Sequence, residues 1–189
     1  MPLFAIALLA APPALGRPID DIWETDCTAF GKNGRHGIVT QVTISGRKIE
    51  AVAQVHATPA CALPTFKVFF RGRIDKASDT MPSALRFTVQ AIDLTPQHQA
   101  VVDQYNRNDD EGRHGCGLSR WKLNGAKSVA GHLCTPFQFA KIGTTLYDAV
   151  WIDPDGLMRF GGFPLIWDND AEEKRPVKPL SVAYHRIKR

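Results

Sequence analysis

Apolar and polar residues alternate with a period of two along most of this 189-residue chain, and this pattern restricts the fold more than any other feature. Residues 38–44 and 49–55 alternate on either side of the turn residues 45–48, and residues 66–74 and 85–91 repeat the pattern. Successive side chains of a strand point to opposite faces, so the pattern predicts half-buried β-strands. About ten short strands at this spacing are typical of a closed barrel or a sandwich. We expect an all-β fold, an antiparallel up-and-down barrel of about 8–10 strands.

One short helix is expected to interrupt the strands. Thr95 can cap its N-terminus, Pro96 suits its first turn, and apolar residues follow at helical spacing up to Asn106. The segment 167–175 is rich in acidic residues and is expected to be an exposed loop. No break in composition divides the chain, so residues 17–189 are expected to form a single domain. The remaining strands are expected at residues 22–30, 117–123, 127–133, 146–152, 157–161 and 180–184.

Four widely spaced cysteines point to an oxidising compartment. No pair has the C-x-x-C spacing of a zinc ribbon or a thioredoxin-type site. An even number in an exported chain indicates disulfides, and four cysteines allow three connectivities. The cysteines are Cys27, Cys61, Cys116 and Cys134.

Of these connectivities we predict Cys27–Cys61 and Cys116–Cys134. Residues 117–123 and 127–133 are expected to form a hairpin around a three-residue loop that contains glycine. That hairpin places Cys116 opposite Cys134, with the Cα atoms about 4.5 Å apart, a distance that a disulfide can span. The length of the chain between Cys27 and Cys61 is compatible with the other bridge.

Residues 1–16 carry no charge and are rich in Ala, Leu, Ile and Phe. The run is shorter than the roughly 20 residues that a membrane span needs, and it suits the apolar core of a signal peptide with a cleavage site at Ala14-Leu15-Gly16. Signal peptides usually have a basic residue shortly after the first methionine, and none follows Met1 here. The alternative, a buried apolar segment, is disfavoured by Pro12-Pro13. We expect residues 1–16 to be a signal peptide and the protein to be periplasmic or secreted, not membrane-spanning.

The charge distribution argues against a nucleic-acid partner. The formal net charge is +4, and the basic residues are scattered among acidic ones. Proteins that bind nucleic acid usually show a continuous basic stripe, which is absent here. The densest basic stretch is the tail, residues 185–189.

The sequence contains no recognisable catalytic motif: no Gly-x-Ser-x-Gly elbow, no phosphate loop and no H-x-x-x-H pair. His114, within the polar segment 109–116, could take part in a metal site or an acid–base pair, but a disulfide-anchored exposed loop is the commoner arrangement. Residues 153–156 lack the later glutamate of a calcium loop and fit a type I hairpin turn. His56 and His132 could ligate haem, although strand histidines are more often structural. We therefore expect no enzyme activity, no metal and no cofactor.

Three features resemble the lipocalin, or calycin, group of barrels. Trp23 opens the first strand of the expected mature chain, Arg186 lies in the last strand, and hairpins follow one another between them. In that family the tryptophan packs at the closed end of the barrel under the arginine, in a cation–π contact. Asp21 replaces the glycine that usually precedes the tryptophan by two residues, and the helix interrupts the barrel instead of following it. The resemblance implies a Trp23–Arg186 contact and a binding function for a small apolar ligand in the barrel mouth.

Large aromatic side chains on the inward faces can either fill the barrel or line a cavity in it. Filling is the commoner outcome, because protein interiors pack densely, but Ala51, Ala53 and Ala91 would leave room for a ligand. We predict an exported, non-catalytic, lipocalin-like binding protein for a small apolar ligand. The alternative is a protein-interaction or inhibitor module that uses the surface loops 109–115 and 167–175. The predicted ligand-binding residues are Phe66, Phe70, Phe87 and Trp121.

Overall fold

The structure, a computed structural model, describes residues 17–107, 114–135 and 137–187. The predicted signal peptide, residues 1–16, and the acidic residues 109–111 lie outside the described residues. The described part is mostly β-structure with one short α-helix. Its elements are β1 (Ile22–Thr25), β2 (Thr28–Phe30), η1 (Lys32–Gly34), β3 (His36–Ser45), β4 (Lys48–His56), β5 (Pro64–Ala77), β6 (Ser83–Pro96), α1 (Gln99–Tyr105), η2 (His114–Gly117), β7 (Lys127–Ser128), β8 (Leu133–Cys134), β9 (Phe137–Gln138), β10 (Thr145–Ile152), β11 (Met158–Phe160), η3 (Glu172–Lys174) and β12 (Tyr184–Arg186).

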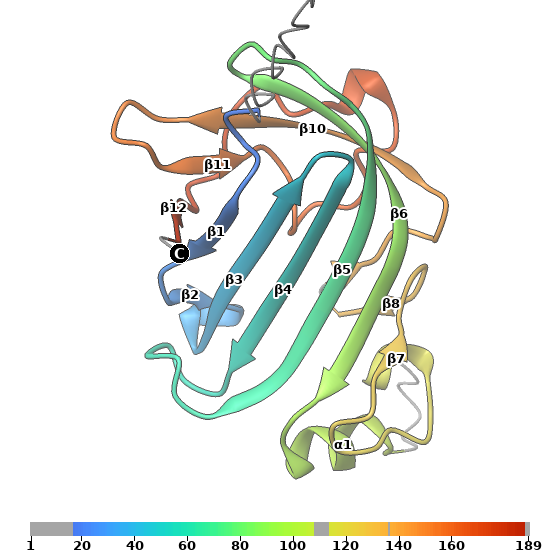
Figure 1. Cartoon of the computed structure of the whole chain (residues 1–189). Helices are drawn as coiled ribbons and strands as arrows, with labels where there is room; N and C mark the ends of the chain where they lie inside the picture. The colour runs from blue at the N-terminus through green and yellow to red at the C-terminus, as the bar shows by residue number, and fades with distance from the viewer. Residues whose placement is uncertain (1–16, 108–113, 136, 188–189) are drawn as a thin grey trace, which may run out of the picture.

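Eight strands close into an antiparallel barrel. The order around the barrel is β3, β4, β5, β6, β10, β11, β12 and β1, and β1 closes it by pairing with both β12 and β3. The short strands β2 and β7 add to β3 and β6, and β8 pairs with β9 separately. In Figure 1 the long strands β3 to β6 form one curved wall, and β10 runs across its upper end. The predicted fold class, an all-β antiparallel barrel with one short helix, is confirmed.

The β3–β4 hairpin forms where the alternation predicted it. Gly46 and Arg47 make the turn between the two strands, and Gly46 has a φ of 54°, in the region that favours glycine. The inward side chains Val42 and Ile49 are completely buried. Period-two alternation therefore sorts these two strands into a core face and a solvent face.

Strands β5 and β6 are each 14 residues long and are bent by irregular pairing. Arg71 pairs with Ala91 while the next residue of β5 pairs with Val89, so Gln90 has no partner in the ladder. An extra residue bends its strand and reverses the alternation beyond it. Ala91, predicted to share the inward face of Val89, therefore lies off that face, and the fully buried Ile92 takes the inward position.

Trp23 of β1 seals one end of the barrel. Its side chain is 1% exposed, and its indole N–H donates to the carbonyl of Ile19 at 3.0 Å. The Arg186 guanidinium lies over the ring, 4.8 Å from the centroid, and its Nε is 3.2 Å from a carboxylate oxygen of Asp21. The predicted Trp23–Arg186 contact is confirmed. Asp21 forms an ion pair with the arginine.

The predicted hairpin over residues 117–133 is wrong. The short strands in this range, β7 and the start of β8, pair with β6 and β9 instead. Asn106 takes up the backbone groups that a hairpin would use, because its side chain accepts from the N–H of Trp121 at 2.7 Å and donates to the carbonyl of the same residue at 2.9 Å. Cys116 and Cys134 still form the predicted disulfide, since η2 packs beside β8.

Helix α1 begins later than predicted. Thr95 and Pro96 belong to β6, where both pair with β5. His98 is the N-cap, and its ring Nδ1 accepts from a backbone N–H of the first turn at 3.3 Å. The helix ends at Tyr105 with Asn106 as its C-cap, as expected. Strand pairing has overridden the local preference for a threonine cap.

Candidate ligand-binding cavity

A cavity of about 640 Å³ opens at the end of the barrel opposite Trp23. Its barrel walls are the first residues of β3 and β5 and the last residues of β4 and β6. Pockets for small molecules usually measure about 300–1,000 Å³ and are mostly apolar. The apolar lining residues from the barrel strands are Ile38, Ala51, Ala53, Val55, Phe66, Val68, Phe70 and Leu94.

Phe66 and Phe70, two of the four predicted ligand-binding residues, line this cavity from β5. Phe87 does not line it. Phe87 is fully buried below the cavity, with its ring centroid 5.8 Å from that of Phe70 and 5.7 Å from that of Phe163. These rings fill the middle of the barrel, so Phe70 marks the floor of the cavity.

Trp121, the fourth predicted residue, lies behind the cavity wall. Its side chain is buried, its ring centroid is 5.2 Å from that of Tyr105, and its N–H is 3.1 Å from the carbonyl oxygen of Gly115. Tyr105 and Gly115 both line the cavity, so Trp121 supports that wall from outside. Burial raises the pKa of Tyr105 to about 12, above its ordinary value of 10.

Small residues on β4 create much of the free space. Ala51 and Ala53 line the cavity, as their position on the inward face predicts. Val52, between them, points to the outer surface and is 37% exposed. Because larger side chains at 51 and 53 would occupy the interior, these alanines keep this part of the barrel hollow.

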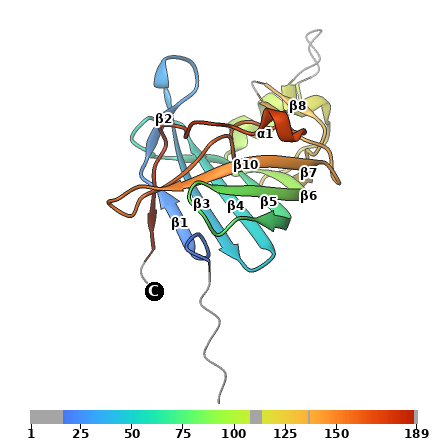
Figure 2. The same ribbon diagram turned by 90° about the horizontal axis from the view of Figure 1, so that it is seen from above.

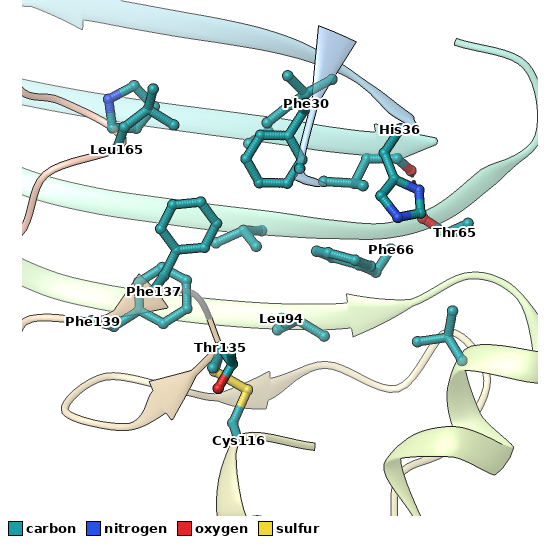
Figure 3. Close-up of a pocket in the computed structure, with 18 of the residues that line it drawn as sticks. Phe30, His36, Thr65, Phe66, Leu94, Cys116, Thr135, Phe137, Phe139 and Leu165 are labelled. Carbon is teal, nitrogen blue, oxygen red and sulfur yellow. Dashed lines mark hydrogen bonds between the residues drawn. A yellow bond between two sulfur atoms is a disulfide. The ribbon is translucent and has the colours of Figure 1, made fainter. Parts of the chain in front are cut away.

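Two aromatic rings meet across the mouth of the cavity. Phe30 at the end of β2 stacks on Phe137 of β9, with ring centroids 5.6 Å apart and planes 8° from parallel (Figure 3). Phe30 also lines a second, smaller cavity of about 190 Å³. Seen from above, β2 and β8 lie at two corners on the same side of the barrel (Figure 2). Phe137 was not predicted as a site residue, because no periodicity marks its short strand.

Trp167 provides a further wall of the cavity. Its ring centroid is 5.5 Å from those of both Phe70 and Phe139, and its side chain is only 8% exposed. Its buried indole N–H has no hydrogen-bond partner among the described residues. The predicted exposed loop, residues 167–175, is therefore wrong at its first residue. The apolar run of residues 163–167 was the available sequence signal.

The far end of that segment is also held against the barrel. The Arg175 guanidinium donates to the carbonyls of Leu85 and Asp148, at 2.8 and 2.6 Å, and stacks on the ring of Tyr147. Asp168, Asp170 and the residues of η3 are exposed, whereas Asn169 between the two aspartates is buried. The segment thus packs across β6 and β10 and presents Trp167 to the cavity.

Both predicted disulfides form, and both lie near the open end. Cys27–Cys61, with Cα atoms 5.9 Å apart, joins the β1–β2 connection to the β4–β5 loop. Cys116–Cys134 joins η2 to β8, and both of its residues line the cavity (Figure 3). The bridges tie irregular segments to the barrel exactly where strand pairing does not hold them.

Positive charge lies on the rim, on the connection between β2 and β3. Lys32 and Arg35 both line the cavity and are exposed. Arg35 Nε donates to Nε2 of His36 at 3.0 Å, and the buried Nδ1 of His36 has no partner among the described residues. Among the lining residues that the structure describes, none is Asp or Glu.

A buried carboxylate anchors the segment that leads to Trp167 in the cavity wall. Asp148 of β10 accepts hydrogen bonds from the backbone N–H groups of Ala149, Gly162 and Phe163, at 2.7, 3.0 and 2.8 Å. Burial raises the pKa of Asp148 to about 6, although these hydrogen bonds favour the charged form and act in the opposite direction. The ionised carboxylate is therefore less stable in the folded protein than in water.

We expect wild type to gain about 1 kcal/mol of stability relative to Asp148→Asn as the pH falls from 8 to 5. The folded-state pKa of about 6 lies above the ordinary value of 3.8, so the folded protein binds this proton more tightly than the unfolded chain does. The resulting stabilisation is complete below the ordinary pKa and is lost as the pH rises through the folded one. Urea unfolding of both proteins at each pH measures the difference. If the free energies of unfolding of the two proteins depended on pH in the same way, the raised pKa of Asp148 would be contradicted.

The histidines considered as haem ligands do not line the cavity. His56 ends β4, and Nδ1 of His132 is 3.0 Å from the carbonyl oxygen of Cys116. The side chain of His114 lies outside the described part. Within residues 17–107, 114–135 and 137–187, no three His, Cys, Asp or Glu side chains lie close enough together to hold a metal ion. Residues 153–156 form the β10–β11 turn, as the alternative to a calcium loop predicted.

The comparisons with known proteins give no family assignment. None of the helices in the described ranges is both long and apolar enough to cross a membrane. No protein-family model matches the chain, and no curated protein has a significantly similar sequence.

Proposed function

We propose that this protein is an exported, non-catalytic binding protein that holds a small apolar ligand in the open half of its barrel. The observation that carries the proposal is the contrast between the two ends of the barrel. Trp23 and Arg186 seal one end, whereas the other keeps about 640 Å³ of space lined by aromatic and aliphatic side chains. Protein interiors rarely leave voids larger than a few water molecules, so space of this size and character favours an occupant.

The barrel also supports a lipocalin-like assignment. Its strands follow one another in sequence order around the ring, and the first strand meets the last through Trp23 and Arg186. Helix α1 lies between β6 and β7, which differs from the usual position after the barrel. An eight-stranded barrel is just wide enough for one small ligand. Because fold alone does not determine function, the proposal rests on the cavity.

The disulfides support a periplasmic or secreted location. Such bridges persist in oxidising compartments and are rare in the cytosol. Both bridges of this protein join segments around the open end of the barrel. They add cross-links to the β1–β2 connection, the β4–β5 loop and η2, none of which belongs to a strand of the barrel.

Titration with dodecanol, followed by tryptophan fluorescence, tests the proposal. Among the four tryptophans only Trp167 lines the cavity. We expect a saturable change at a 1:1 ratio that Trp167→Phe reduces at least fivefold in amplitude, because the reporter next to the ligand is lost.

Trp121→Phe and Trp151→Phe are the matched controls, and both should keep the signal. Calorimetry should show that Trp167→Phe still binds the probe, since phenylalanine retains an apolar wall. Absence of saturable binding to wild type would refute the proposed function. A signal that depends on Trp151 would place the ligand elsewhere.

A further inference from the structure

Among the described residues that line the cavity, the Lys and Arg side chains lie on one segment of the rim. Lys32 and Arg35 lie on the β2–β3 connection, and neither forms an ion pair with a described residue. Some cations of the barrel are paired, such as Arg71 with Glu50 and Arg159 with Asp153, and others, such as Lys76, are not, but of the described Lys and Arg residues only Lys32 and Arg35 line the cavity. Two cations that have no ion-pair partner among the described residues create a positive potential at the opening of the apolar cavity, where a ligand must pass.

The backbone of this connection holds the two cations at the rim. Gly31 and Gly34 have φ values of 78° and 63°, which side chains other than glycine adopt at a cost. A Cβ atom on Gly31 would lie 3.1 Å from Cδ2 of His36. Hydrogen bonding fixes Arg35 further, because its Nε donates to the His36 ring, which leaves the terminal guanidinium nitrogens free to donate elsewhere.

Apolar and charged groups follow one another in order from the inside outward. Phe66 lies in the cavity wall, and the Phe30–Phe137 stack lies at the mouth (Figure 3). The two cations of the β2–β3 connection line the cavity and are exposed. Phe30 is only two residues from Lys32, so the ring and the charge belong to one short segment. This order matches a molecule with an apolar chain at one end and a negative charge at the other.

We propose that the ligand is an amphiphile whose anionic head group is bound at the rim by Arg35 and Lys32 while its apolar chain fills the cavity. This inference rests on the proposed function and specifies the class of ligand. A guanidinium presents its N–H groups in a fork that suits a carboxylate, and an ammonium group adds a second charge beside it. The head stays near water, so its desolvation is limited, and the chain provides the apolar contact.

The experiment compares dodecanoate with dodecanol, which differ only at the head group, by calorimetry at low ionic strength. In wild type we expect the cations of the rim to raise the affinity for dodecanoate. In the Lys32→Gln/Arg35→Gln variant the ratio of the dodecanoate affinity to the dodecanol affinity should fall about fivefold or more. Added salt should reduce the preference of wild type. Dodecanol should still bind the variant saturably at a 1:1 ratio, which shows that the cavity itself is intact.

Lys76→Gln/Lys178→Gln is the matched control, since it removes the same charge from exposed positions outside the cavity lining. It should leave the affinity ratio as in wild type. Equal ratios in wild type and the rim variant, with dodecanol still bound, would overturn the inference and leave the proposed function standing. Failure of both probes to bind wild type would overturn both.

Discussion

Ala53→Phe should weaken dodecanol binding at least tenfold, a loss of about 1.4 kcal/mol or more in binding free energy. Ala53 lines the cavity from β4, so a phenylalanine there would occupy space that the ligand needs. The free energy of unfolding should change by no more than about 1 kcal/mol, because the new ring fills a void and does not crowd a packed core. Calorimetry and urea unfolding give the two quantities.

Val52→Phe is the control for this substitution. Val52 is the neighbouring residue of the same strand, but it lies on the outer face and is 37% exposed. The introduced side chain is the same phenylalanine, but it lies on the opposite face of the strand. Dodecanol affinity should stay as in wild type. If both variants bound the probe equally well, the ligand would not occupy this cavity.

Replacing Cys116 and Cys134 by serine should lower the free energy of unfolding by about 3 kcal/mol, within the range of about 2–5 typical of native bridges in secreted domains. The bridge spans a sequence separation of 18 and ties η2 to β8, which share no strand pairing in the described structure. Loss of the bridge increases the conformational entropy of the unfolded chain, and it removes the covalent link that holds one wall of the cavity. Urea unfolding under non-reducing conditions measures the change.

Cys27→Ser/Cys61→Ser provides the comparison. Loss of the Cys27–Cys61 bridge should lower the free energy of unfolding by a similar amount. The bridge spans a sequence separation of 34, and the stabilisation depends only on the logarithm of the loop length. Cys27 and Cys61 do not line the cavity, whereas Cys116 and Cys134 do. At a temperature where both variants are folded, only the replacement of Cys116 and Cys134 should therefore also weaken dodecanol binding. An equal loss of dodecanol affinity in the two variants would show that each bridge affects binding only through the stability of the fold.

The sequence predicts the barrel because alternation and turns are local signals. Residues 38–44 and 49–55 carry enough period-two pattern to fix both the hairpin and its inward face. The bend in β6 escapes this reasoning, since nothing local marks Gln90 as an extra residue, and Ala91 was assigned to the wrong face. The Trp23–Arg186 contact came from a family resemblance, not from the pattern itself.

The cavity could be predicted only in part. Phe66, Phe70, Ala51 and Ala53 belong to regular strands, so their inward positions follow from alternation. Phe137 and Trp167 reach the cavity from irregular segments, whose path depends on contacts far away in sequence. Phe87 and Trp121 are buried but do not line the cavity. For Phe87 the reason is that periodicity gives a face and not a depth along the barrel axis, and for Trp121 the reason is that the expected strand does not form.

The pairing of Cys116 with Cys134 was predicted correctly from a hairpin that does not exist. Trp121 is held by the side chain of Asn106, and this long-range contact replaces the expected ladder. The disulfide depends on the meeting of η2 and β8 in space, which a different local structure achieves. A correct contact therefore does not validate the local structure from which it was inferred.

The most direct test of a ligand-binding cavity is a two-dimensional ¹H–¹⁵N NMR titration of the wild-type protein with dodecanol. The account predicts saturable 1:1 shifts at the backbone amides of Ala53 and Phe66 and at the indole N–H of Trp167, which has no hydrogen-bond partner in the described structure. The indole N–H of Trp23, at the sealed end, should not move. Absence of saturable shifts, or shifts confined to outward-facing residues such as Val52, would contradict the account.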